Sequence, residues 1–497
     1  MQNVPFYAPN KRVFMTSVVA PPYYCLEDWQ GGHRTQPQEF AYWIEEVTGT
    51  IPADLTGTLF RNGPGRLDRG GQRYHHPFDG DGMINQISFR QGTAFYRNRY
   101  VQTPEFQAEQ QANKILYRGV FGTQKPGGWL NNIFDLRLKN IANTNVIYWG
   151  GKLLALWEAA PPYRLDPGNL ATLGLDHLGG ILAPGQPFSA HPRIDPQGLL
   201  VNFGVQTGPS TQINLYEFDP NWNLVRQHQH PVAGFAFLHD FILTENYYVF
   251  FQNPVSFNPL PYILGWTGAA QCLHFDAEQP TRILVIPRRG GSVRVFLTDA
   301  CFVFHHANGY EQGQELILDA ICYSRFPTID QQTDYQTVDF ASLPSGQLRR
   351  FRVNLTTHRV TQTLLLERCC EFPQVHPQRV GRAYRRVYLG VAADPVANAP
   401  LQGIMALDVE TGRQQMWLAG RRGFVSEPVF VPRGEAEDQG WLITVVYNAA
   451  RQCSDVVILD AADVAAGAVA TLHLRHHIPY GLHGSFTPQL FGELAAL

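Results

Sequence analysis

The stretch FVFHHANGYE, residues 302–311, follows the run SVRVFLTDAC at residues 292–301. Apolar and polar residues alternate through the first run, which predicts a β-strand that leads into the histidine pair. Successive side chains on a strand point to opposite faces, so only one of His305 and His306 can face the interior. A lone histidine on an apolar strand is more often a packing residue than a ligand. A metal site therefore requires other histidines that converge on this one.

The composition limits the classes of protein. Of the 497 residues, 44% are hydrophobic and only 16% are charged. The formal net charge is −3 and no basic block is present, which excludes nucleic acid as an expected partner, since phosphate binding needs clustered Lys and Arg. Seven cysteines without a CxxC pair favour a reducing, cytoplasmic compartment. Pro21 and Pro22 cut short the apolar run at 13–20, so a signal peptide is only a weak alternative, and we expect no transmembrane helix.

Short strand-like runs separated by Gly- and Pro-rich turns recur from residue 58 to the C-terminus. The runs TLFRNGPG (58–65), VIYWGGKLLALWEA (146–159) and GWLITVVYN (440–448) are examples. So many short strands in one chain predict an all-β protein and favour a β-propeller, although no clean repeat period is visible. Residues 1–58 are predicted to be irregular, with one helix-prone segment, PQEFAYWIEEV, at 37–47.

Residues 246–275 contain no Asp, Glu, Lys or Arg. Prolines at 254, 259 and 261 prevent a continuous helix there. The segment 257–266 gathers six large apolar side chains: Phe257, Leu260, Tyr262, Ile263, Leu264 and Trp266. It is either a buried loop that covers the core or a partly exposed patch that contacts a membrane or frames a tunnel mouth. Residues 123–134 are a second candidate for the same role.

Four of the 17 histidines lie in strand-like or turn contexts far apart in the chain. They are His191 in SAHPRIDPQG, His239 in GFAFLHDF, His305, and His483 in IPYGLHGSF. No short-range metal-binding signature links them. In a propeller, however, the innermost strand of every blade borders one central axis, where a histidine from each of four blades could meet.

Several motifs together resemble the carotenoid cleavage oxygenase family from about residue 27 to about residue 486. They are LFRNGPG, HHPFDGDGM, the four histidine contexts, WEA, CEFPQ, SEPVFVPR and HIPYGLHGSF. LRLKNIANTN, SAHPRIDP and CCEFP are similar to the apocarotenoid-cleaving branch of cyanobacteria. The resemblance implies a single domain over residues 1–497: a seven-bladed propeller capped by loops and short helices, with residues 1–26 as an irregular extension. It implies one Fe(II) per chain, held by His191, His239, His305 and His483, with His306 turned away.

The resemblance also assigns carboxylates to the histidines. Glu158 would hold His239, Glu371 would hold His305 and Glu427 would hold His483, whereas His191 would have no such partner. Glutamates that hydrogen-bond the histidines, and not the metal itself, would orient the rings and offset the charge of the iron. Thr144, in NIANTNV, corresponds to the family threonine whose methyl group crowds one open position on the metal.

The implied reaction is cleavage of a carbon–carbon double bond by O2 to give two aldehydes. The expected substrate is an apocarotenal, cut at the 15,15′ bond to yield retinal. The alkene supplies all the electrons, and we find no nucleotide-binding or serine-nucleophile motif. We expect a monomer that contacts the membrane surface peripherally. Alternatives are a family enzyme that cleaves another carotenoid or stilbene bond, an isomerohydrolase, a non-catalytic carotenoid-binding propeller, and a four-histidine zinc propeller for a polar substrate.

Overall fold

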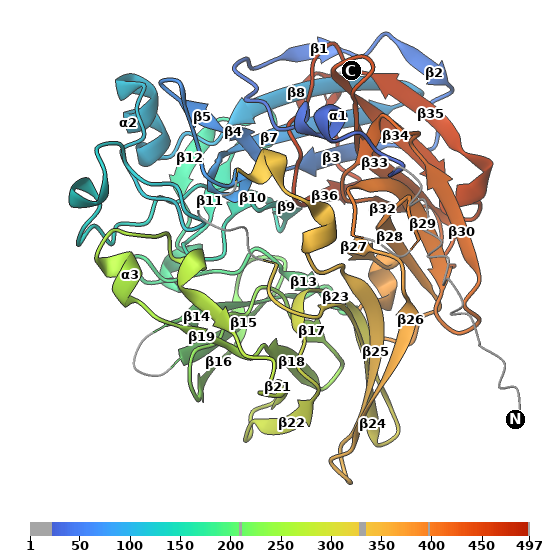
Figure 1. The fold of residues 1–497 in the computed structure, drawn as a ribbon. Coiled ribbons are helices and arrows are strands. Elements are labelled where there is room, and N and C mark those ends of the chain that lie inside the picture. The colour runs from blue at the N-terminus through green and yellow to red at the C-terminus, as the bar shows by residue number, and fades with distance from the viewer. Residues whose placement is uncertain (1–21, 208–210, 328–333, 396–397, 496–497) are drawn as a thin grey trace, which may run out of the picture.

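The computed structural model describes residues 22–207, 211–327, 334–395 and 398–495. Seven antiparallel sheets of four to six strands surround one axis as the blades of a β-propeller (Figure 1). The predicted all-β, seven-bladed fold is confirmed. Of the predicted N-terminal extension, residues 1–21 lie outside the described residues, and α1 (Leu26–Gln30) begins at its end.

Five blades have four strands each and follow one another in the chain. The first two of these blades contain β9 (Asn145–Trp149), β10 (Lys152–Leu156), β11 (Tyr163–Leu165) and β12 (Thr172–Leu175), and then β13 (Arg193–Ile194), β14 (Leu200–Gln206), β15 (Thr211–Phe218) and β16 (Leu224–Val232). The third contains β17 (Ile242–Leu243), β18 (Tyr247–Gln252), β21 (Thr281–Pro287) and β22 (Arg294–Thr298). The last two contain β23 (Phe302–Gln312), β24 (Glu315–Tyr323), β25 (Gln347–Asn354) and β26 (Val360–Leu366), and then β27 (Cys370–Gln374), β28 (Arg386–Ala392), β29 (Leu401–Asp408) and β30 (Gln414–Leu418). The middle strands are buried on both faces, which is why they appear in the sequence as nearly continuous apolar runs.

The other two blades combine strands from both ends of the chain. One contains β1 (Ala41–Trp43), β3 (Gly57–Arg61), β4 (Pro64–Arg66), β7 (Asp81–Arg90), β8 (Thr93–Tyr100) and β36 (Gly484–Thr487). The other contains β2 (Val47–Gly49), β31 (Gly423–Val425), β32 (Val429–Pro432), β33 (Gly440–Asn448), β34 (Cys453–Asp460) and β35 (Ala468–His473). The pairs β3–β36 and β2–β35 therefore close the ring twice.

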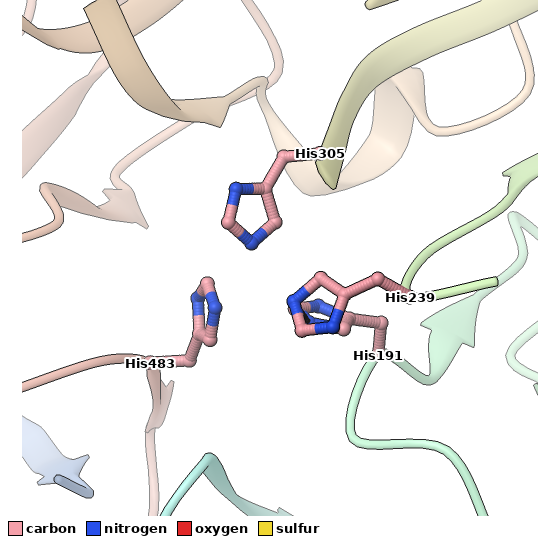
Figure 2. Close-up of side chains that lie close together, drawn as sticks. All are labelled: His191, His239, His305 and His483. Atoms are coloured by element: carbon pink, nitrogen blue, oxygen red, sulfur yellow. Dashed lines mark hydrogen bonds between the residues drawn. The ribbon is translucent and has the colours of Figure 1, made fainter. Parts of the chain in front are cut away.

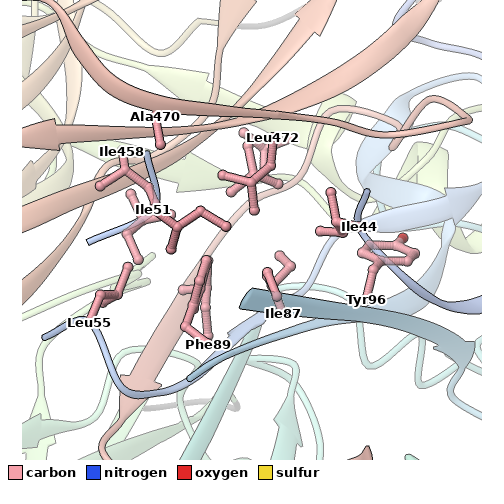
Figure 3. Close-up of a cluster of buried hydrophobic side chains, with 14 of the residues drawn as sticks. Ile44, Ile51, Leu55, Ile87, Phe89, Tyr96, Ile458, Ala470 and Leu472 are labelled. Carbon is pink, nitrogen blue, oxygen red and sulfur yellow. The ribbon is translucent and has the colours of Figure 1, made fainter. Parts of the chain in front are cut away.

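The prediction of a helix-prone segment at residues 37–47 was wrong, because this segment forms β1 and the start of β2. Phe40, Tyr42 and Ile44 turn toward the hydrophobic core between the two closing blades, whereas Ala41 and Trp43 face outward. Figure 3 shows this core, in which Ile87 and Leu472 from the two blades pack together. Packing at a period of two residues outweighed the helix propensity of Glu and Ala here.

The run at 292–301 was expected to continue into the histidine pair, but it belongs to another blade. β22 ends at Thr298, and β23 begins at Phe302 in the next sheet. Within β23 the register shifts on either side of His306, where the strand has β-bulges. The break follows from the geometry of a propeller, in which an outer strand must return to the axis before the next blade begins.

Short helices and loops lie above the blades. The helices are α1, α2 (Pro104–Ala112) and α3 (Leu260–Ile263), and small strand pairs are formed by β5 (Asp68–Arg69) with β6 (Gln72–Arg73) and by β19 (Val255–Phe257) with β20 (Leu273–Phe275). None of the described helices is long and apolar enough to cross a membrane.

Arg118 joins two of these loops. Its guanidinium donates to the carbonyl oxygens of Asn132 (3.2 Å) and Asp135 (3.0 Å) in one loop, and to those of Tyr262 (2.9 Å) and Thr267 (2.7 Å) in the other. It also lies 4.1 Å from the centroid of the Tyr262 ring. The segments 129–138 and 257–267 each carry exposed apolar side chains, and one buried arginine bonds to both.

Candidate metal centre

Four histidines meet on the axis of the propeller. His191 and His239 immediately precede the blades that begin with β13 and β17, His305 lies on β23, and His483 directly precedes β36. One ring nitrogen from each lies within 4.8 Å of those of the other three. Figure 2 shows the four rings arranged around a common centre. The predicted histidines, far apart in the sequence, therefore form one cluster.

The rings are close but do not stack. Ring centroids are 4.4 Å apart for His191 and His239, 4.6 Å for His191 and His483, and 4.9 Å for His305 and His483. The planes of these pairs are inclined by 62° to 82°. Edge-on rings direct nitrogen lone pairs, rather than ring faces, toward the shared centre.

Three glutamates hydrogen-bond the outer nitrogens of three of these rings. Nδ1 of His239 lies 2.6 Å from Oε2 of Glu158. Nδ1 of His305 lies 2.6 Å from Oε2 of Glu371. The third pair is His483 Nδ1 with Glu427 Oε1, at 2.8 Å. These are the three pairs that the sequence predicts, and among the described residues no carboxylate bonds to the His191 ring.

Two of these glutamates, Glu371 and Glu427, are held as charged groups. Burial raises the pKa of Glu371, but His305, a hydrogen bond from Tyr323 and the backbone N–H of Phe372 outweigh it, so that the net pKa is lowered. Burial also raises the pKa of Glu427, and His483 and Arg61 outweigh it to a lowered value. An ionised carboxylate accepts the Nδ1 proton of its histidine, which leaves the Nε2 lone pair free on the inner side.

The histidine pKa values reflect the same surroundings. Burial, followed by the charges of the other three histidines, lowers the pKa of His191 well below its usual value. The pKa of His483 is also lowered, chiefly by burial and against the attraction of Glu427. For His305 burial is opposed by Glu371, whose charge and hydrogen bond leave the pKa raised.

The structure also places the two remaining residues of interest. Thr144 is buried beside the histidines: its carbonyl accepts from the backbone N–H of His483 (3.1 Å), and its hydroxyl donates to Asn143 Oδ1 (3.2 Å). His306 points away from the cluster, as predicted, and packs against Phe251 with 5.0 Å between ring centroids.

The histidine cluster opens on a cavity of about 430 Å³. Thr144, Glu158, His239, His305, Glu371 and His483 border this cavity, whereas His191 and Glu427 lie behind its wall. Much of the remaining lining is aromatic: Trp157, Phe237, Phe304, Phe326, Phe372 and Phe424. The four-histidine group therefore borders a largely apolar space.

Two supporting residues were not predicted. Arg61 donates to Glu427 over 2.5 Å and to the carbonyl of Leu482, next to His483. Tyr323 donates its hydroxyl to Glu371. Arg61 stands in the motif LFRNGPG, so a charged residue within an otherwise apolar and turn-forming motif was the available signal. Tyr323 ends a strand and has no comparable signal.

The donor set fits a borderline transition metal. Imidazole nitrogens suit Fe, Zn, Cu and Ni. Nε2 of His305 is buried, and no described residue hydrogen-bonds to it. Nε2 of His191 and Nε2 of His239 are only 2.9 Å apart, a distance at which two lone pairs repel unless a proton or a cation lies near them. The four-histidine group can thus hold a metal ion.

The fold and this centre define a β-propeller in which a four-histidine group that can hold a metal ion borders an apolar cavity. A family model described as retinal pigment epithelial membrane protein matches residues 33–488. The chain belongs to this family, which includes the carotenoid cleavage oxygenases.

Individual relatives agree with this assignment. The chain is 50% identical to apocarotenoid-15,15′-oxygenase from Synechocystis over 473 residues, which cover 93% of this chain and 96% of that protein. It is 30% identical to a carotenoid 9,10(9′,10′)-cleavage dioxygenase from Phaseolus vulgaris, over 89% of this chain and 86% of the relative. The crystal structure of cobalt-substituted apocarotenoid oxygenase from Synechocystis superposes with a TM-score of 0.92 at 50% identity, covering 94% of this chain and all of that one. The resemblance noted in the motifs is confirmed.

Proposed function

We propose that this protein is a non-haem Fe(II) dioxygenase that cleaves a carbon–carbon double bond of an apocarotenoid with O2 and releases two aldehydes. The observation that carries the proposal is a four-histidine centre that opens on an aromatic cavity of about 430 Å³. The similarity over nearly the whole length to an apocarotenoid-15,15′-oxygenase favours the 15,15′ bond and retinal as a product.

Each predicted site residue has a role in this proposal. One iron per chain would be held by His191, His239, His305 and His483. Hydrogen bonds from Nδ1 of three of these rings to Glu158, Glu371 and Glu427 would orient the rings and leave Nε2 without a proton. Bound ferrous iron supplies the site at which O2 becomes reactive. Since the Thr144 hydroxyl is engaged by Asn143, its methyl group is the part that can limit access to the metal.

The cavity contributes positioning. Its aromatic walls bind a rigid polyene and keep water from the reacting double bond, while the alkene provides the four electrons that O2 accepts. The products are two carbonyl compounds, so no reducing cofactor is consumed. A non-catalytic carotenoid-binding protein would not need three glutamates that hydrogen-bond a histidine cluster.

We further propose that the chain is one domain, acts as a monomer in the cytoplasm, and docks on a membrane surface. Leu260 and Trp266 are 56% and 54% exposed, and in the neighbouring loop Leu130 and Phe134 are 67% and 69% exposed. The N–H of Phe134 donates to the carbonyl of Ile263 (2.8 Å), so that these side chains form one patch. Burying three such side chains in lipid contributes several kcal/mol, at about 1.5–3 kcal/mol each. That is enough for reversible attachment.

The deciding experiment is product analysis. The iron-loaded protein is incubated aerobically with an apocarotenal, and the aldehydes are separated by chromatography while O2 uptake is recorded. Retinal with one O2 consumed per substrate is expected. Aldehydes of another length would show that a different double bond is cleaved. Binding of the apocarotenal without O2 uptake would refute the proposed oxygenase activity.

A further inference from the structure

A second pair of histidines borders the cavity and has no part in the metal centre. His33 follows α1, and His76 precedes the short 3-10 turn η1 (Pro77–Asp79). Each ring lies against Tyr335, with centroid distances of 5.1 Å for His33 and 6.3 Å for His76. Both histidines therefore lie against one tyrosine and border the same cavity.

His76 offers an N–H group to the cavity. Its Nδ1 accepts from the backbone N–H of Phe78 over 3.1 Å, which caps η1. Burial, together with the charge of His75, lowers the pKa of His76 to about 3, so the ring is neutral. A neutral imidazole that accepts at Nδ1 must carry its proton on Nε2. The ring is stacked on Phe121 (5.2 Å), and both side chains line the cavity.

His33 has a polar atom without a partner. The residue is 9% exposed, and no described residue hydrogen-bonds to its buried Nε2. Burial, followed by the charge of His76, lowers its pKa to about 3. The ring is fixed edge-on by Trp29 (4.5 Å) and Tyr480 (4.7 Å). Leaving a buried donor or acceptor unpaired is costly, so such a group calls for a ligand that pairs with it.

We propose that His33 and His76 form an oxygen-binding subsite, which recognises the polar end group of an otherwise hydrocarbon polyene. This inference rests on the proposed function and adds a requirement to it: the substrate carries a carbonyl or hydroxyl oxygen at one end. A cavity with only apolar walls would not distinguish an apocarotenoid from an oxygen-free polyene. The His76 N–H donates to either kind of oxygen, and His33 pairs with the same atom or with its hydroxyl proton.

The test uses two substitutions that separate the two hydrogen bonds of the His76 ring, and one substitution at His33. His76→Asn keeps an acceptor near the position of Nδ1 for the Phe78 N–H and removes the cavity donor. His76→Gln places an amide N–H near the position of Nε2 and removes the cap. His33→Phe keeps the ring contacts with Trp29 and Tyr480 and removes both nitrogens.

Three polyenes of equal length are used: a terminal aldehyde, the same aldehyde with a hydroxylated ring, and one without oxygen. His76→Asn and His33→Phe are expected to lower kcat/KM for the plain aldehyde about 2- to 10-fold, the range of one net hydrogen bond, and to leave the oxygen-free polyene unchanged. His76→Gln should stay closer to wild type. If only the hydroxylated substrate loses kcat/KM, the oxygen bound is that of the ring; if both aldehydes lose it, the oxygen is the carbonyl. Equal losses on all three polyenes, or no loss on any, would overturn the subsite.

Binding to the metal-free protein provides a readout that needs no turnover. A hydrogen bond to the carbonyl shifts the visible absorption of a bound polyene aldehyde to longer wavelength, and His76→Asn should diminish that shift. If wild-type protein cleaves none of the polyenes, the proposed function fails, while the absorption shift still decides whether the subsite exists.

Discussion

The carboxylate of Glu371 lies 2.6 Å from Nδ1 of His305, and the hydroxyl of Tyr323 donates to its other oxygen. Glu371 is thus fixed from two sides, and it in turn fixes the plane of the imidazole. Glu371, on β27 of the next blade, therefore sets the direction of the His305 Nε2 lone pair.

Glu371→Gln is expected to weaken iron retention or turnover about 10- to 100-fold, because the amide keeps the shape but loses the charge that supports the imidazole. Metal content after dialysis and the rate of aldehyde formation are the measurements, with circular dichroism to verify folding. Glu410→Gln, which alters an exposed glutamate paired with Arg385, is the matched control and should change neither. Parent-like metal content and rate in Glu371→Gln would contradict the prediction.

Alanine at any one of His191, His239, His305 or His483 should reduce bound iron well below one per chain and abolish measurable cleavage. Removing one of four ligands weakens the metal centre and opens it to water. Iron is measured by atomic emission after gel filtration. His274→Ala, on the exposed strand β20, should bind iron as the wild type does. A histidine whose alanine variant stays fully loaded and active is not a ligand.

Arg61→Leu should destabilise the protein by about 3–5 kcal/mol, because it leaves the buried Glu427 without its cation. Denaturant unfolding followed by tryptophan fluorescence measures the loss. The exposed pair of Arg433 and Asp460 gives the comparison, and Arg433→Leu should cost at most about 1 kcal/mol. Similar losses in the two variants would show that burial of the Arg61 pair is unimportant.

Serine at Leu260, Ile263 and Leu264 should reduce co-sedimentation with lipid vesicles. It should also slow turnover of vesicle-borne substrate far more than that of detergent-dispersed substrate. Leu173→Ser/Leu175→Ser, which alters two exposed leucines of β12, is the control and should bind vesicles normally. If the triple variant sediments like the parent, the loop is ordinary packing.

Arg118→Met should release the segment 129–138 from the segment 257–267, because four carbonyl contacts are lost at once. We expect faster proteolysis of both loops and weaker vesicle binding, with iron content unchanged. Limited proteolysis with mass spectrometry locates the cuts. Loss of iron as well would indicate general unfolding instead of release of the two loops.

The blade strands and the grouping of the four histidines with three glutamates agree with the sequence analysis for different reasons, while the roles of the eight site residues stay predictions. Strands such as β33 are evident from their own apolar runs. The meeting of His191 with His483 depends on ring closure, which no local pattern encodes, and it became visible only through the family motifs. The contacts of Arg61, His33 and His76 were not predicted because they depend on packing between distant parts of the chain. The strand at 41–43 was misjudged because local propensity was given more weight than the alternation of Phe40, Tyr42 and Ile44.

The pairing of β3 with β36 has a consequence for biosynthesis. His483 directly precedes β36, the last of the described strands, so a nascent polypeptide on the ribosome carries three of the four histidines long before the fourth appears. Closure of the ring and completion of the histidine set then occur in the same late event. A chain cut before residue 483 therefore lacks both the strand that pairs with β3 and the fourth histidine.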